Sequence, residues 1–271
     1  MRSLREIAIL EEGRQARAIA DVADAYAEIA GGFVCRGEPG TWCNTAVGLG
    51  LAGPVTEDDV DRLVAWFVDH GREPNIELCP FADDTLRRSL ARRGFVLRIF
   101  ENCFFRELSV GDEFKPRHGQ PTDIEIRRID PHDPTAVREY GMAVATGFSD
   151  KPPRESDIDL MARCATHERS IAFGAYHAGR CIAGGAVEVC GEVAALFGLS
   201  VLPDFRRRGI QQALIATRLQ LALSHGATIA TISSRPGVPT EGNVRRMGFQ
   251  VAYTKAVLTR PGVGLAPVHE L

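Results

Sequence analysis

Alternating apolar and polar positions predict that strands and helices follow one another along most of this chain. Short apolar runs have the length of strands in the C-terminal half, at 124–129, 172–176, 181–189 and 195–202. Apolar residues spaced three or four apart predict helices at 135–146, 157–168 and 212–224, and in the N-terminal half at 11–30. Asp133 and Pro134 suit the N-cap and first turn of the helix over 135–146. This order favours an α/β fold with a mixed sheet (α+β).

A sequence repeat predicts two domains of one fold. Residues 90–97 (LARRGFVL) resemble residues 244–251 (VRRMGFQV), at a spacing of about 155 residues. Both copies predict a strand, a helix, Gly-Phe and a second strand, over 75–79, 83–93 and 95–108 in the first and 227–233, 240–247 and 249–258 in the second. Gly, Pro and mixed charges break the pattern between the copies. We therefore expect a domain at 1–108, a linker at 109–123 and a second domain at 124–271.

Composition narrows the class of protein. The chain has 271 residues, of which 45% are hydrophobic and 25% charged, as in soluble globular proteins. A net charge of −3 argues against a nucleic-acid partner, and no apolar stretch reaches the roughly 20 residues of a membrane span. The polar start lacks a signal peptide's apolar core, and the seven scattered cysteines lack metal-site spacing. We expect a cytoplasmic protein with reduced thiols, no metal and no membrane partner.

The most informative stretch is Arg206-Arg207-Arg208-Gly209-Ile210-Gln211, between an apolar run and a predicted helix. A helix N-terminus carries about half a positive charge, so three arginines there are unfavourable unless an anion is bound. Backbone N–H groups and guanidinium groups together hold phosphate well, and Gly209 allows the backbone to come close to it. The stretch predicts a pyrophosphate-binding loop.

This loop, the preceding Val201-Leu202-Pro203-Asp204-Phe205 and the later Asn243…Gly248-Phe249 resemble the GNAT superfamily of acyl-CoA-dependent N-acyltransferases. Gln211 departs from the family's small residue at that place. The resemblance implies two tandem GNAT-like domains, acetyl-CoA or another acyl-CoA as co-substrate, and a small-molecule or peptide amine as acceptor, in a monomer or homodimer. It implies cofactor contacts from Leu199, Ser200, Val201, Arg206, Arg207, Arg208, Gly209, Ile210, Gln211, Gln212 and Asn243.

The catalytic groups are less clear from the sequence. Many relatives have a Tyr that acts as the general acid at the position of Val244. Tyr253 on the next strand is the nearest substitute, although packing in the core is an equally good interpretation of this residue. Glu188 is the best remaining carboxylate for a general base, with an ordinary surface role or proton loss through water as alternatives. His167 and His177 are weaker candidates. Residues 147–150 and the helix from Asp157 would shape the acceptor pocket.

A second glycine-rich segment, at residues 48–53, has the G-x-G-x-x-G spacing of a dinucleotide-binding turn. Its context argues against that role, because Thr56 and Asp59 suit a capping box and the first-turn acids would repel phosphate. The first domain is therefore expected to be a degenerate copy without a CoA site. The expected function is N-acetyl transfer from acetyl-CoA to a primary amine, directly in a ternary complex. The alternative is a non-catalytic CoA-binding sensor or regulatory module.

Overall fold

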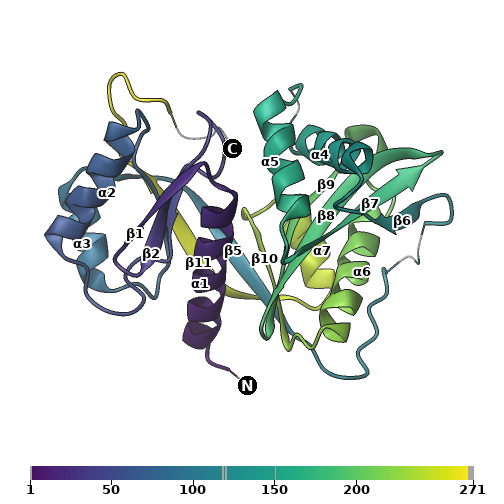
Figure 1. The fold of residues 1–271 in the computed structure, drawn as a ribbon. Helices are drawn as coiled ribbons and strands as arrows, with labels where there is room; N and C mark the ends of the chain where they lie inside the picture. Colours follow the sequence, from purple (N-terminus) through teal and green to yellow (C-terminus); the bar gives the residue numbers. More distant parts are fainter. Residues whose placement is uncertain (1, 118, 120, 150, 268–271) are drawn as a thin grey trace. The chain divides into compact units, whose positions relative to one another are not determined.

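A computed structural model describes residues 2–117, 119, 121–149 and 151–267 (Figure 1). By internal contacts the chain divides into two compact units. Unit 1 comprises residues 1–103 and 251–271, and unit 2 comprises residues 104–250. This division differs from the boundaries expected from sequence mainly in the C-terminal strand, which pairs with a strand of the N-terminal half.

Unit 1 contains three helices and a sheet in the order β1-β2-β3-β4-β11. Its helices are α1 (Leu4–Val22), α2 (Glu57–Asp69) and α3 (Asp84–Arg92). Its strands are β1 (Ala25–Ile29), β2 (Gly32–Arg36), β3 (Thr45–Val47), β4 (Asn75–Leu78) and β11 (Gln250–Thr259), with the first part of β5 (Val96–Glu107). Strand β11 runs antiparallel to β4, with Leu258 opposite Ile76.

The helix predicted over 11–30 is wrong at both ends. Helix α1 starts after Ser3, whose side chain and Glu6 form a capping box, and it ends at Val22. The remaining residues form β1, which makes a tight hairpin with β2 through Ala30 and Gly31 at positive φ. Pairing between β1 and β2 is a tertiary contact that outweighs the helical spacing of the segment.

The core of unit 1 forms between α2, α3 and the sheet. Val60, Leu63 and Phe67 on α2 are fully buried, together with Leu86 and Leu90 on α3. Burying one side chain of this kind contributes roughly 1.5–3 kcal/mol to the free energy of folding. The apolar spacing on the two helices therefore fixes which face of each helix covers the sheet.

Unit 2 contains the elements that position the candidate site. Its helices are α4 (Pro134–Phe148), α5 (Glu155–Thr166), α6 (Ile210–Ser224) and α7 (Pro239–Arg246), with a short 3-10 helix at Pro203–Phe205. Its strands β6 (Glu125–Arg128), β7 (Ser170–His177), β8 (Arg180–Cys190), β9 (Val193–Val201) and β10 (Ile229–Ser234) lie in the order β10-β9-β8-β7-β6. The mixed α/β fold and the predicted helices and strands of this half are confirmed.

Helices α4 and α6 cover opposite faces of this sheet. A Cβ on Gly184 of β8 would lie 2.6 Å from the ring of Tyr140 on α4. A Cβ on the next residue, Gly185, would lie 3.0 Å from the guanidinium of Arg218 on α6. Because successive strand residues point to opposite faces, the two helices sandwich β8 and β9.

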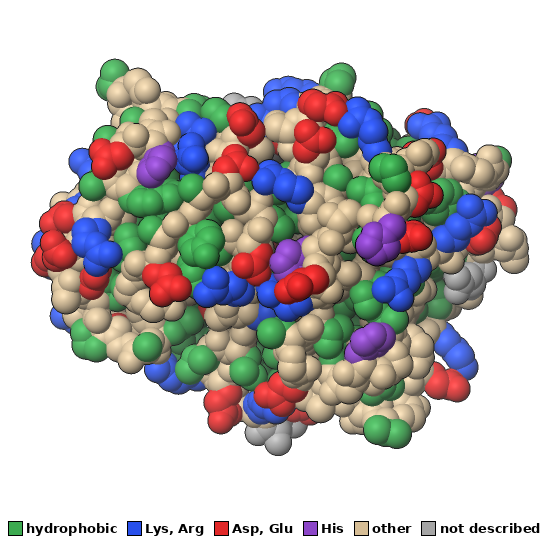
Figure 2. All heavy atoms as spheres, viewed as in Figure 1, with side chains coloured by type: hydrophobic (Ala, Val, Ile, Leu, Met, Phe, Trp, Pro, Cys, Tyr) green, Lys and Arg blue, Asp and Glu red, His purple; other side chains and the backbone are tan. Residues whose placement is uncertain are grey.

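Charges of both signs are interspersed on the face drawn in Figure 2. Among the residues that the structure describes, no three His, Cys, Asp or Glu side chains are grouped as a metal ion would need. Within the same residues, no helix combines the length and apolar character needed to cross a membrane. The seven cysteines are free thiols, and all but Cys190 are buried.

Candidate functional site

The site begins where β9 and β10 separate. The two strands pair in parallel from Val193 opposite Ile229 to Ala195 opposite Thr231, and their pairing stops there. Strand β9 continues to Val201 alongside β8. After Ala195, the edge of β9 that faced β10 therefore has no parallel partner. An unpaired strand edge of this kind offers backbone N–H and C=O groups to a ligand.

Strand β9 also contains a bulge at the point of separation. Its register with β8 shifts between Ala186 opposite Phe197 and Gly184 opposite Ser200, and Gly198 has a φ of 62°. A glycine in the left-handed region is typical of a bulge, which redirects the following backbone groups. The sequence analysis placed cofactor contacts on Leu199, Ser200 and Val201 but did not identify the bulge before them.

The loop after β9 brings the backbone to the start of α6. Arg207 has a φ of 64°, and Gly209 is the N-cap of α6 with a φ of 78°. As a glycine, the N-cap residue has no side chain with which to cap the first turn of α6. A helix start leaves its first backbone N–H groups without intrahelical partners, and an anion can satisfy them. The local geometry thus fits the phosphate-binding role predicted for residues 206–212.

The three arginines of the loop have different surroundings. The guanidinium of Arg206 donates from Nε to the carbonyl of Val201 (3.1 Å) and from Nη2 to the carbonyl of Gly147 (3.0 Å). Arg208 forms an ion pair with Asp123 and lies over the ring of Phe205. In the described part of the chain, the exposed Arg207 has no recorded ion pair. Arg206 therefore holds the loop in place, whereas Arg207 and Arg208 present charge near the helix start.

A network of side-chain amides follows the loop. Gln211 donates to the hydroxyl of Thr240 (3.0 Å) and accepts from the amide of Asn243. Gln212 donates to the side-chain oxygen of Asn243 (3.0 Å) and accepts from the backbone N–H of Arg117 (3.0 Å). The departure at Gln211 thus has a structural use, since its side chain joins α6 to α7. The structure brings Asn243 next to Gln211 and Gln212, as part of this network.

Ser200 and Val201 meet the end of α4 closely. The hydroxyl of Ser200 donates to the carbonyl of Val144 (2.9 Å), and a Cβ on Gly147 would lie 2.5 Å from the Ser200 hydroxyl oxygen. The side chain of Ser200 is thus bound to the fold, so a cofactor contact at this residue would use the backbone. The carboxylate of Asp157 accepts from the backbone N–H (3.3 Å) and the Nε (2.8 Å) of Arg154 at the start of α5, and residue 150 lies outside the described residues.

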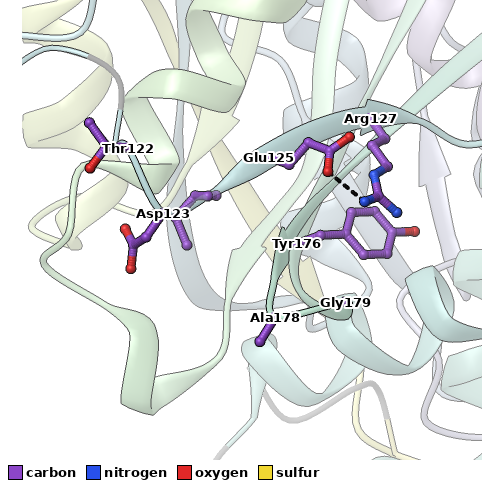
Figure 3. Close-up of a pocket in the computed structure, with 8 residues that line it drawn as sticks. Thr122, Asp123, Glu125, Arg127, Tyr176, Ala178 and Gly179 are labelled. Carbon is purple, nitrogen blue, oxygen red and sulfur yellow. Dashed lines mark hydrogen bonds and ion pairs between the residues drawn. The ribbon is translucent and has the colours of Figure 1, made fainter.

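An open polar hollow of about 370 Å³ lies beside the loop (Figure 3). Glu125 pairs with Arg127, whose guanidinium covers the ring of Tyr176, while the carboxylate of Asp123 points away from this pair. Asp123 bonds Arg208 instead and also lies 3.4 Å from the Nδ1 of His177. The hollow therefore borders the loop of residues 206–209 through one shared carboxylate.

The two predicted catalytic side chains lie in different units, and each is buried and bonded to another side chain. The hydroxyl of Tyr253, in unit 1, donates to the carboxylate of Glu12 (2.7 Å), and burial strongly raises the pKa of its phenol. Glu188, in unit 2, is 2% exposed and accepts from the Nε of Arg169 (2.8 Å). The catalytic roles of Tyr253 and Glu188 stay predictions. Val244, at the position of the family's acidic Tyr, is fully buried.

The corresponding helix start in unit 1 is occupied by its own acids. Thr56 is the N-cap of α2 and forms the predicted capping box with Asp59. Glu57 in the same turn is bonded to Arg93, and this pairing lowers the pKa of its carboxyl to about 2. The glycine-rich turn before it is closed by backbone bonds, with Gly50 donating to Ala30 and accepting from Asp83. This helix start presents carboxylates where unit 2 presents arginines.

Comparison with known proteins shows what the second half of the chain resembles. The model of the acetyltransferase (GNAT) family matches residues 134–249, which include β9, the loop and α6. This segment is therefore similar to the acetyltransferase (GNAT) family.

Relatives agree with this assignment. An uncharacterized N-acetyltransferase of Streptomyces griseus subsp. griseus is 32% identical over 123 residues, which cover 40% of this chain and 27% of that protein. The chain thus aligns with about a quarter of the length of this curated relative.

Solved structures share the fold over nearly the whole chain. A GCN5-related N-acetyltransferase from Kribbella flavida has a TM-score of 0.69 at 18% identity, covering 96% of this chain and 98% of that one. A tandem GNAT protein from the clavulanic acid biosynthesis pathway has a TM-score of 0.61 at 15% identity, covering 89% and 85%. The fold is therefore that of GCN5-related N-acetyltransferases, including a tandem member.

Proposed function

We propose that unit 2 binds acetyl-CoA, or another acyl-CoA, and transfers the acyl group to a primary amine of a small molecule, amino acid or peptide. The observation that carries the proposal is the start of α6. Uncapped N–H groups, a left-handed Gly209 and two arginines meet there at the end of a strand that has separated from its neighbour. This combination suits a pyrophosphate joined to a long extended arm.

Each part of the site has a proposed task. The first turn of α6, with Arg207 and Arg208, would hold the pyrophosphate, while the unpaired edge of β9 at Leu199–Val201 would bind the pantetheine arm. Bound acetyl-CoA would supply the activated thioester. Backbone N–H groups near the bulge would polarise its carbonyl, as preorganised donors do in acyl transfer. The acceptor amine would enter between the loop after α4 and helix α5, and the reaction would proceed directly in a ternary complex.

We further propose that unit 1 is a degenerate copy that does not bind CoA. The acidic first turn of α2 supports this, because carboxylates at a helix start already complement its dipole and repel phosphate. Its capping box already uses the N–H group of Asp59, one of those that a phosphate would need. We therefore expect each chain to bind one molecule of acyl-CoA.

An amine screen tests the function. Full-length protein would be incubated with acetyl-CoA and a panel of primary amines, and free thiol would be measured. We expect turnover with at least one amine, lost in Arg208→Glu. The matched control is Arg127→Glu, which removes another exposed ion pair of unit 2 and should leave turnover unchanged. Acetyl-CoA binding without turnover would favour the sensor or regulatory module, and no binding would overturn the proposal.

A further inference from the structure

Three glycines of unit 2 lie together in the sheet at the bulge of β9. Gly184 and Gly185 on β8 lie beside Gly198 on β9. The ring of Tyr140 occupies the space beside Gly184 on one face, and the guanidinium of Arg218 occupies the space beside Gly185 on the other. Any larger residue at 184 or 185 would displace one of the two side chains. The two glycines therefore leave the space that Tyr140 and Arg218 occupy.

Tyr140 reaches the bulge with a hydroxyl that the fold leaves unused. A Cβ on Gly198 would lie 3.6 Å from the Tyr140 hydroxyl oxygen, and Tyr140 is only 2% exposed. In the described part of the chain, no hydrogen bond is recorded for this hydroxyl. The hydroxyl oxygen is not among the side-chain atoms buried without a partner, so it keeps some access to solvent and is open to a ligand or reactant.

Arg218 is a second buried group with an unused donor. It is 0% exposed, its Nη1 donates to the carbonyls of Ala186 (2.9 Å) and Phe197 (3.2 Å), and its Nη2 has no partner among the described residues. No carboxylate pairs with it in that part of the chain, and burial lowers the pKa of its guanidinium to about 10. At neutral pH it therefore places an uncompensated positive charge beside the bulge.

The hydrogen bond to Phe197 also orients the next backbone donor. In a trans peptide the C=O and N–H groups point in opposite directions. With the carbonyl of Phe197 held by Arg218, the N–H of Gly198 points away from α6. A cation on the carbonyl polarises the same peptide, which strengthens its N–H as a donor.

We propose that Tyr140 is a catalytic proton donor for acyl transfer in unit 2 and that Arg218 is the residue that positions the bulge and stabilises the phenolate. The inference rests on the proposed function. As the amine nitrogen bonds to the acyl carbon, the C–S bond breaks and sulfur takes its electron pair. The Tyr140 hydroxyl gives its proton to that sulfur. The amine loses a proton to water, and water returns one to the phenolate.

The groups around Tyr140 act on its proton in opposite directions. Burial raises the pKa of its phenol, so the hydroxyl is protonated at neutral pH but gives up its proton less readily than a free phenol. Arg218 opposes that rise by stabilising the phenolate, while the thiols of Cys164 on α5 and Cys181 on β8 raise the pKa further. Arg218 is therefore the group that makes proton release by Tyr140 easier.

The first test is Tyr140→Phe in the full chain, assayed with acetyl-CoA and an amine that the wild type accepts. We expect kcat to fall about 100-fold, as for loss of a general acid, with the Kd for acetyl-CoA changed less than twofold. Tyr176→Phe is the matched control, another buried tyrosine of unit 2, and should keep full activity. Equal activity in Tyr140→Phe and wild type would overturn the inference and leave the proposed function standing.

Arg218 is tested by Arg218→Met and Arg218→Lys. We expect Met to lower kcat with little change in acetyl-CoA binding, and Lys to restore part of it by returning the charge. A purely structural role would instead weaken binding and thermal stability together, without rescue by Lys. That result would overturn the role of Arg218.

A third test measures acetyl-CoA binding at Tyr140 without any acceptor amine. The chain has four tyrosines, so fluorotyrosine labelling gives four fluorine signals that Tyr→Phe variants assign. We expect acetyl-CoA to move the Tyr140 signal and to leave that of Tyr26, in unit 1, in place. An unmoved Tyr140 signal at saturation would overturn the inference, and absence of acetyl-CoA binding would overturn the proposed function as well.

Discussion

Replacing Gly209 by Ala separates the phosphate-binding role proposed for the loop before α6 from the contribution of this residue to stability. Gly209 has a φ of 78°, a conformation that costs an L-residue roughly 1–2 kcal/mol. A Cβ there would meet only Pro121, at 3.9 Å, so it adds no steric clash within the described protein. The loss of stability in Gly209→Ala should therefore stay near that backbone cost.

The effect on binding should be larger, because the methyl group would be added at the N-cap of α6, where the phosphate is proposed to bind. Losing one charge-assisted hydrogen bond costs about 1.5–3 kcal/mol, which weakens acetyl-CoA binding about 10-fold to 100-fold. Binding and stability would thus change by different amounts in this variant.

Gly226→Ala is the matched control. Gly226 has a φ of 80°, has no atom within 4 Å of an added Cβ, and follows the other end of α6. Thermal unfolding should show similar losses of stability for the two variants, while titration with acetyl-CoA should show weakened binding for Gly209→Ala alone. Equal affinity in the two variants would refute the placement of the pyrophosphate at the start of α6.

Two further predictions concern unit 1. The Lys255 ammonium is buried between the carboxylates of Glu12 (3.1 Å) and Glu77 (2.9 Å), so Lys255→Met should cost about 3–5 kcal/mol of unfolding free energy. Glu12→Gln should cost clearly less, because burial already raises the pKa of Glu12 and disfavours its charge, and equal losses in denaturant unfolding would contradict this account. The Arg93 guanidinium lowers the pKa of Glu57 from 4.5 to about 2, so the folded state binds this proton less readily than the unfolded state. The stability from this pair should be present above about pH 4.5 and lost as the pH falls toward 2, and thermal unfolding of Glu57→Gln across that range should lack this part of the acid sensitivity.

The sequence predicted the parts of the fold that depend on local rules. Arginines at a helix start pointed to the loop before α6, and the caps at Thr56 and Asp133 mark helix starts in the structure. These signals are local because capping and the helix dipole act within one turn.

What the sequence did not reveal depends on which strands pair and which side chains pack together in the fold. The β1–β2 hairpin replaces part of a predicted helix, and β11 pairs with β4 across more than half of the chain. Tyr140 and Arg218 meet the β9 bulge only because Gly184 and Gly185 lack side chains. The double glycine was the available signal, but its meaning requires knowing which helix covers each face.

The most direct test of the account is the number of acetyl-CoA molecules bound per chain. Calorimetric titration of the full-length protein should show one site per chain, lost in Arg208→Glu, because among the described helices the uncapped start with arginines belongs to unit 2. Two sites would contradict the degenerate role proposed for unit 1, and no binding would contradict the acyltransferase function itself.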